Sequence, residues 1–443
     1  MNNAPILIIQ MQRMGDLVLS FPLLGWLARL YPEHPLWVVG ERCFFEPLMP
    51  LAPKATFFDV NSLPDFSGIT FHAVINLSHR REAAQLAGSV KSDSLFGSRL
   101  DNQGRLFING EWQLYRASLT HNNRYNRYHW SDLNALDVVP TGVMRKTLWP
   151  RPRTGDRSRE HGARIGLFLG ASQPDKHPDV DFWVELSRPL LGRGQKPVLL
   201  GGKAEEPLGT AVAGALDIAA INLGGRFDVS SLARFISELD LLISPDTGPM
   251  HIATWVGTPV LNISLGPVNP WETGPFSPGH HIIRQALGCT GCWGCVQQEL
   301  LCKKVLRPAH VALMAEALVF NQLDTVCAAF PDGVEILRSR RDRNGLYELE
   351  TPPGCASRVQ HFINAPSGFR ESATQRSAFS CFWKAWFGTQ FGIFDTDAMK
   401  NAWSELRETQ PEAAEELHAS SKNFLLELAR DSRRGSLLAD SQS

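Results

Sequence analysis

The chain has 443 residues, of which 43% are hydrophobic and 20% are charged, and its formal net charge at pH 7 is −1. This length favours two or more domains, and the near-neutral charge disfavours a general nucleic-acid-binding protein. No apolar run approaches the ~20 residues that cross a bilayer, and the N-terminus lacks the pattern of a secretory signal. We therefore expect a cytoplasmic protein with free thiols.

The first 150 residues have the strand–helix–strand pattern of a parallel α/β sheet. The run "ILII" (6–9) is continuously apolar, as in a strand that is buried on both faces. A loop ending in Gly15-Asp16 follows, and apolar residues then recur at helical spacing as far as Tyr31. Further strands are expected in "PLWVVG" (35–40) and "FHAVINLS" (71–78). The pattern predicts a Rossmann-like domain over residues 1–150.

A segment rich in proline, glycine and charge, residues 150–163, separates this unit from a second one. The α/β pattern restarts at "RIGLFLGAS" and continues through "KPVLLGG" and "LLISPD", which predicts a second Rossmann-like domain over residues 163–329. We expect two doubly wound domains that face each other across a cleft. In such sheets, ligands bind outside the carboxyl ends of the strands.

The pattern changes from residue 330 onward. The stretch "GVEILRSRRDRNGLYELE" is typical of a β-hairpin with an Asn-Gly turn. Amphipathic helical stretches follow, such as "DTDAMKNAWSELRE" and "AAEELHASSKNFLLELARD". We interpret residues 330–443 as an accessory α+β region, and no catalytic motif is visible in it.

Polar residues gather at four strand-to-helix junctions, and each has a structural reading as well as a functional one. Asp16 follows the first strand, where a carboxylate either caps a helix or acts as a general base. In "GASQPDKHPD" (170–179), Ser172 ends a run of small residues, Gly170-Ala171-Ser172, that allows close backbone approach to a ligand. Lys176 either lies in solvent or binds a phosphate. In "GGKAEE" (201–206), Glu205 either complements a helix dipole or binds ribose hydroxyls.

The fourth junction, "SPDTGPMHIATWVG" (244–257), is the richest in polar residues. Asp246, Thr247 and Gly248 precede a proline that suits the first position of a helix, and His251 lies in the first turn. The free amides and the dipole of that helix end form an anion site. A capped turn explains the acid, the proline and the glycine, but it does not explain why threonine and histidine lie beside them.

These residues, in this order, resemble glycosyltransferase family nine, the ADP-heptose:lipopolysaccharide heptosyltransferases. The matching stretches are "RMGDLVLSFPLL", "GASQPDKHPD", "GGKAEE" and "SPDTGPMHIATWVGTPV", followed by "GPVNPWETGP", and the resemblance covers roughly residues 5–320. The second stretch departs from the family pattern, which often has an aromatic residue where Gln173 stands and Lys-x-Trp-Pro where this chain has Lys176-His177-Pro178.

The resemblance implies a GT-B fold and inverting transfer of heptose from ADP-heptose to an acceptor hydroxyl, with no cofactor or catalytic metal. It implies that Asp16 is the general base and that Lys176 lies near the donor phosphates. Glu205 then matches the ribose-binding acid. The donor-binding and diphosphate loop is matched by Asp246, Thr247, Gly248 and His251.

The favoured acceptor is the lipopolysaccharide inner core, modified at the cytoplasmic face of the inner membrane by a peripheral enzyme. An anionic core would suit the arginines of the first half, which are Arg13, Arg80, Arg81 and Arg127. Two alternatives stay open. One is a transferase that uses a nucleotide sugar on a protein or on another glycan, and the other is a non-catalytic protein that binds sugar nucleotides.

Four of the eight cysteines crowd into "CTGCWGCVQQELLC", at positions 289, 292, 295 and 302. Cys-x2-Cys is a common metal-chelating spacing, so Cys289, Cys292, Cys295 and Cys302 are candidate ligands of a structural zinc or iron ion. A loop of reduced thiols is the alternative.

Overall fold

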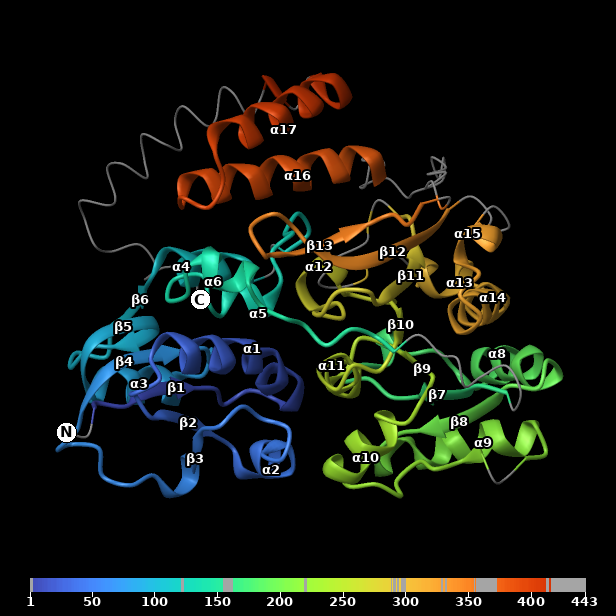
Figure 1. Ribbon diagram of the computed structural model, residues 1–443, viewed down its shortest axis with the longest axis horizontal. Coiled ribbons are helices and arrows are strands. Elements are labelled where there is room, and N and C mark those ends of the chain that lie inside the picture. Colours follow the sequence, from blue (N-terminus) through green and yellow to red (C-terminus); the bar gives the residue numbers. More distant parts are fainter. Residues whose placement is uncertain are drawn as a thin grey trace.

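The computed structural model describes residues 3–415 apart from 121–122, 154–161, 219–220, 288, 290–291, 293–294, 296–299, 328–329, 331–332, 354, 356–372 and 412–413. Two α/β bodies lie side by side, and a pair of helices from the C-terminal part lies across one end of both (Figure 1). The expected GT-B architecture, with two Rossmann-like domains, is confirmed. Part of the expected linker 150–163 and most of the expected helix near 413–431 fall outside the described residues.

The first domain is built on a six-stranded sheet of order β3-β2-β1-β4-β5-β6, in which β6 alone is antiparallel to its neighbour. Every residue of β1 is buried, as its apolar run predicts. The strands are β1 (Ile6–Ile9), β2 (Leu36–Gly40), β3 (Thr56–Asp59), β4 (Thr70–Asn76), β5 (Lys91–Leu100) and β6 (Leu106–Asn109).

The helices of this domain cover the sheet and connect its strands. They are α1 (Met14–Leu30), α2 (Arg42–Phe45), α3 (Arg81–Ser89), α4 (Glu111–Ser118), α5 (Trp130–Leu133) and α6 (Thr141–Arg145), with 3-10 turns η1 (Glu46–Leu48) and η2 (Val60–Ser62). The main apolar cluster packs α1 against β1 and β4 and continues into the second domain through Ile252 and Phe276. The two domains therefore share part of a core.

The second domain has a seven-stranded sheet of order β13-β12-β11-β10-β9-β7-β8, parallel except for β12 and β13. Its strands are β7 (Arg164–Phe168), β8 (Lys196–Leu200), β9 (Leu241–Ser244), β10 (Val260–Ile263), β11 (His281–Gln285), β12 (Val334–Arg341) and β13 (Tyr347–Glu350). The expected hairpin forms as β12 and β13, and it extends this sheet past residue 330, the expected start of the accessory region.

The helices of the second domain follow its strands in alternation. They are η3 (Pro174–Lys176), α8 (Val180–Gly192), η4 (Lys203–Glu205), α9 (Glu206–Ala215), α10 (Val229–Ile236), α11 (Gly248–Trp255), α12 (Pro270–Thr273), α13 (Leu301–Val305), α14 (Pro308–Val319) and α15 (Leu323–Val326). In both sheets the strand order reverses beside the first strand, between β1 and β4 and between β7 and β9. These switch points are where open α/β sheets bind ligands.

Helices α16 (Ala373–Gln390) and α17 (Thr396–Thr409) pack on each other and on both domains. The ring of Phe391 meets Trp112 of α4 at 5.0 Å between ring centroids. On the other side, Lys384 Nζ lies 2.6 Å from Glu348 Oε2 of β13, and both side chains are largely buried. The C-terminal helices thus join the first domain to the sheet of the second.

The expectation of free thiols is wrong for one pair of cysteines. Cys327 and Cys355 form a disulfide, and both residues are buried in the core of the second domain. The fold brings their Cα atoms to 4.7 Å although 28 residues separate them along the chain, so their spacing carried no signal. In the described part of the chain, the other six cysteines form no disulfide.

Candidate active site

The two switch points face each other through the first turns of α1 and α11. A Cβ atom added to Gly15 would lie 3.5 Å from the Gly248 Cα and 3.5 Å from the His251 Cδ2, and one added to Gly248 would lie 2.8 Å from the Met14 Cε. The small residues therefore allow two helix N-termini to approach one region from opposite domains. Free backbone amides and the positive ends of both dipoles favour an anion there.

Lys176 and Asp246, predicted independently as donor contacts, form an ion pair. Lys176 Nζ lies 3.3 Å from Asp246 Oδ2, and the same oxygen accepts a hydrogen bond from Thr273 Oγ1 at 3.2 Å. Lys176 comes from the loop after β7 and Asp246 from the loop after β9, so the pair spans the switch point of the second sheet.

Asp16 lies in the first turn of α1, and its side chain faces protein groups from both domains. Burial raises the pKa of the Asp16 carboxyl, the charge of Asp246 adds to that rise, and the guanidinium of Arg116 opposes it. A carboxylate with a raised pKa is a stronger base than one in water.

Arg116 was not predicted from the sequence, but its charge has the largest effect of any neighbouring charge on the pKa of Asp16. It is 6% exposed, its Nη2 donates to the Leu77 carbonyl at 2.7 Å, and its guanidinium lies 4.6 Å from the Trp130 ring centroid. Burial lowers the pKa of Arg116 to about 10, and the carboxylates of Asp16 and Glu272 oppose the shift. Because the side chain is fixed, its charge stays beside the candidate base.

Glu272, at the end of the matched "GPVNPWETGP" stretch, is a second residue that the sequence did not identify. It is 5% exposed and accepts a hydrogen bond from Asn126 Nδ2 at 3.3 Å, across the domain boundary. Burial raises its pKa to about 7, and the charge of Asp246 contributes to the rise, while Asn126 and Lys176 oppose it. Glu272 therefore titrates near neutrality inside the cleft.

His251 was predicted to point toward a bound anion. It is 4% exposed, and its ring stacks on Phe276 at 6.4 Å between centroids. Burial lowers the pKa of His251 to about 4, so the ring is neutral at pH 7. Its Nδ1 is buried and has no hydrogen-bond partner among the described residues. Thr247, the N-cap residue of α11, makes no side-chain capping bond.

Glu205 packs tightly against the glycines at the ends of β7 and β8. Its Oε2 accepts a hydrogen bond from the Gly202 amide at 2.8 Å, and a Cβ added to Gly170 would lie 2.4 Å from the Glu205 Cδ. Only glycine at 170 leaves room for this carboxylate. Ser172, in contrast, is exposed, and its role as a ligand contact stays a prediction.

The candidate metal ligands are electrostatically coupled to one another. Burial and the neighbouring thiols of Cys289, Cys295 and Cys302 raise the pKa of Cys292 to about 11, and Cys302 Sγ accepts a hydrogen bond from the Gly266 amide at 3.4 Å. Within the described part of the chain, no three or more Cys, His, Asp or Glu side chains are arranged to hold a metal ion. The metal assignment therefore stays a prediction.

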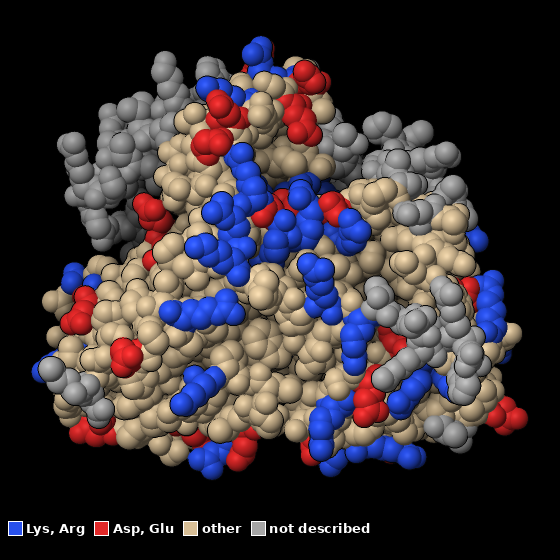
Figure 2. Space-filling model, viewed as in Figure 1, with Lys and Arg blue, Asp and Glu red and all other residues tan. Residues whose placement is uncertain are grey.

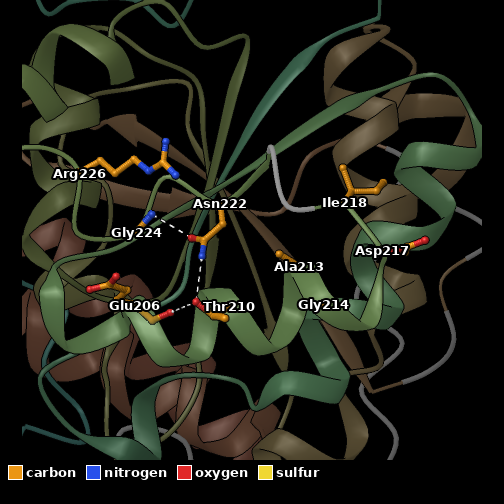
Figure 3. A pocket seen from close by; sticks show the side chains of 9 residues that line it. All are labelled: Glu206, Thr210, Ala213, Gly214, Asp217, Ile218, Asn222, Gly224 and Arg226. Carbon is orange, nitrogen blue, oxygen red and sulfur yellow. Dashed lines mark hydrogen bonds between the residues drawn. The ribbon is translucent and has the colours of Figure 1, made fainter.

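The lining of a cavity of about 370 Å³ includes none of the predicted site residues (Figure 3). At its centre, Asn222 accepts a hydrogen bond from the Gly224 amide and donates one to Thr210 Oγ1. Its lining comprises Glu206, Thr210, Ala213, Gly214, Asp217, Ile218, Asn222, Gly224 and Arg226. Glu206 in this lining is the chain neighbour of Glu205.

The fold and the paired switch points define a class, the two-domain GT-B proteins. Residues 149–302 match the model of a protein family described as "Glycosyltransferase family 9 (heptosyltransferase)". This match confirms the predicted resemblance over that range. The structure is similar to that of E. coli ADP-heptose LPS heptosyltransferase II, with a TM-score of 0.52 and 18% identity, over 72% of this chain and 99% of that chain. At this identity the likeness concerns the fold.

Two curated relatives from Haemophilus influenzae match shorter parts of the sequence. The lipopolysaccharide core heptosyltransferase OpsX is 43% identical over 62 residues, which are 14% of this chain and 18% of the relative. Lipooligosaccharide heptosyltransferase 2 is 30% identical over 125 residues, which are 27% of this chain and 36% of the relative. The matches thus span less than half the length of either relative. In the described part of the chain, no helix is long and apolar enough to cross a membrane.

Proposed function

We propose that the chain is an inverting glycosyltransferase that transfers heptose from ADP-heptose to a hydroxyl of the lipopolysaccharide inner core. One observation carries the proposal: the first turn of α1, which holds Asp16, meets the first turn of α11 at Gly15 and Gly248, next to the ion pair of Lys176 and Asp246. A base and a diphosphate-binding group are thereby placed on opposite sides of one cleft. We assign acceptor binding to residues 1–150 and donor binding to residues 163–329.

The chemistry requires a base for the acceptor proton and a cation or dipole for the leaving group. Asp16 would take the proton of the acceptor hydroxyl as that oxygen attacks the anomeric carbon. The bond from the anomeric carbon to the diphosphate breaks in the same step, and the charge of the departing ADP would be held by Lys176 and the amides at the start of α11. Glu205 would hold the ribose, and His251 and Thr247 the rest of the diphosphate.

The ion pair between Lys176 and Asp246 has a consequence for donor binding. The ammonium group already has one carboxylate partner, so an entering diphosphate must share or displace Asp246. Thr273 holds the same carboxylate oxygen and would keep Asp246 in place as Lys176 turns to the phosphate. Donor binding would thus rearrange a pair that exists beforehand.

A structural zinc or iron ion at the four cysteines, and a peripheral position at the inner membrane, belong to this proposal as secondary parts. The raised pKa of Cys292 means that a metal would have to displace its proton. Metal analysis of the purified chain tests the first part, and substoichiometric metal would rule it out.

The experiment is a screen of nucleotides and sugar nucleotides against the purified chain, followed by an ADP-release assay. A ligand that binds only the native state raises its thermal stability, so ADP and ADP-heptose should raise Tm and uridine or guanosine diphosphates should not. ADP release that depends on an inner-core acceptor supports the proposal. Release with a protein or another glycan would instead support the alternative transferase, and binding without turnover would support a non-catalytic protein.

A further inference from the structure

Four arginines line one small cavity where both domains meet the C-terminal helices. The cavity has a volume of about 30 Å³. The segment after α4, helix α12, strands β11 and β12, and helix α16 each contribute to its wall. The lining residues are Arg124, Asn126, Arg127, Asn269, Trp271, Arg284, Glu335, Arg376, Ser377 and Ser380. On the face shown in Figure 2, basic side chains gather just below α16 and α17.

The charge of this lining is strongly one-sided, because Glu335 is its one carboxylate. Burial acts to raise the pKa of Glu335, but the charges of Arg284, Arg376 and Arg127 lower it overall. Arg127 also lowers the pKa of Glu348, which lies outside the lining. Burial lowers the pKa of Arg376 to about 9, and the like charges of Arg284, Arg124 and Arg127 contribute. Arg124 and Arg376 have further interactions of their own, so Arg284 and Arg127 are the relevant pair.

The side chains of Arg284 and Arg127 are held by hydrogen bonds, but each has one guanidinium nitrogen without a hydrogen-bond partner among the described residues. Arg284 is 1% exposed, and its Nε donates to Glu335 Oε2, while its Nη2 has no partner among the described residues. Arg127 donates to Ser377 Oγ at 2.8 Å and to Cys381 Sγ at 3.1 Å, and its Nε likewise has none. Both guanidinium groups lie over the Trp271 ring, at 4.9 and 4.6 Å from its centroid.

A buried guanidinium nitrogen without a partner carries an energetic cost that a bound anion would remove. The cavity volume of about 30 Å³ compares with the roughly 10–15 Å³ that one water molecule needs on the same scale. The cavity therefore admits a small ion or the head of a larger group, but not a sugar ring. Planar guanidinium groups match the oxygens of phosphate and carboxylate particularly well.

We propose that this cavity is a binding site for a phosphate group, separate from the donor site. The bound group would join Arg127 of the first domain and Arg284 of the second to helix α16. Asn126, beside Arg127, holds Glu272 in the catalytic cleft. Occupancy would therefore stabilise the segment that supports the cleft, and the site does not depend on the proposed transferase activity.

The test is the Tm of the full chain in inorganic phosphate, compared with chloride at the same ionic strength. Phosphate should raise Tm by about 3 °C or more, as expected when a ligand binds only the folded state. Ser380→Asp would place a carboxylate at the cavity wall. We expect this variant to keep the stability of the wild type without phosphate and to lose the phosphate response. Ser377→Asp serves the same purpose if the first variant does not fold.

Three controls establish whether the phosphate response belongs to this cavity. Ser404→Asp adds the same charge on the exposed face of α17 and should leave the phosphate response intact. Lys176→Met should also leave it intact, because its lysine belongs to the donor site. Ser380→Asp and Ser377→Asp should both keep any Tm response to ADP, because ADP binds at the separate donor site. If ADP does not bind the wild type, that result counts against the proposed function and not against the phosphate site.

The source of the phosphate group is distinguished by a parallel arm with glycerol 3-phosphate. An equal response to the ester identifies the head group of a larger ligand, and a response to inorganic phosphate alone identifies the free ion. The proposal is overturned if phosphate and chloride give the same Tm. It is also overturned if Ser380→Asp and Ser377→Asp both fold and retain the full phosphate response, or if Lys176→Met abolishes it.

Discussion

Lys176 and Asp246 form an ion pair of 3.3 Å between the segments that follow β7 and β9, at the switch point where we propose that the donor binds. If Lys176 binds the diphosphate, Lys176→Met should weaken ADP binding by about 10-fold or more, since a hydrogen bond to a charged group contributes ~1.5–3 kcal/mol. Isothermal titration calorimetry measures this. Lys146→Met, which removes an exposed lysine from the first domain, is the control. Unchanged ADP affinity in Lys176→Met would contradict the assignment.

The contact between Gly170 and Glu205 predicts a specific effect of one methyl group. Gly170→Ala would place a Cβ 2.4 Å from the Glu205 Cδ, so the carboxylate has to move. We expect ADP affinity to fall by about 10-fold through loss of one ribose-binding acceptor. Gly142→Ala, where a Cβ meets nothing within 4 Å, should leave affinity unchanged. Equal ADP affinity in both variants would argue against Glu205 as a ribose ligand.

The raised pKa of Glu272 predicts that the free energy of unfolding depends on pH. Its folded pKa, about 7, lies above the ordinary value of 4.5, so the folded state binds the proton more tightly than the unfolded chain. This contribution to stability is present below pH 4.5 and is lost as the pH rises to about 7. Glu272→Gln should remove the dependence and stabilise the protein above pH 7, by at most ~3 kcal/mol. Urea unfolding of both proteins between pH 5 and 8 measures it, and parallel pH curves would refute the role.

The position of Arg116 predicts a shift in the pH profile of catalysis. Its guanidinium favours the charged form of Asp16, so its removal should raise the pKa of the base further. In Arg116→Met, the acidic limb of the kcat/KM profile should move to higher pH. Arg105→Met, which removes an exposed arginine paired with Asp101, should not move it. An unshifted limb in a folded Arg116→Met protein would show that the two groups are not coupled in catalysis.

The ion pair between Lys384 of α16 and Glu348 of β13 predicts that the loss of one partner destabilises the protein more than the loss of both. Lys384→Met leaves Glu348 buried without its cation, and removal of one partner of a buried pair costs about 3–5 kcal/mol. The double variant Lys384→Met/Glu348→Gln should recover much of that loss. Thermal unfolding of the single and double variants measures the coupling, and additive losses would show that the pair does not join the C-terminal helices to the sheet.

The sequence predicted most of the fold because buried parallel strands appear as uninterrupted apolar runs, as in "ILII" and "LLIS". It also identified the side chains that lie next to strand ends in the chain, such as Asp16 and Asp246. It missed Arg116 and Glu272, which reach the cleft from α4 and α12 through contacts distant in sequence. The Cys327–Cys355 disulfide and the pairing of β12 with β11 were not predicted for the same reason. Both depend on contacts between segments that are distant in the sequence, and no local pattern encodes such contacts.

We propose that Asp16 is the base of a heptose transfer in which the opposite domain holds the donor. The most direct measurement compares wild type with Asp16→Asn for transfer of heptose from ADP-heptose to an inner-core acceptor, with ADP affinity measured in parallel. The account predicts that kcat falls about 100-fold or more while ADP affinity is retained, since a general base contributes ~10²–10⁴-fold. Full transfer activity in Asp16→Asn would contradict it.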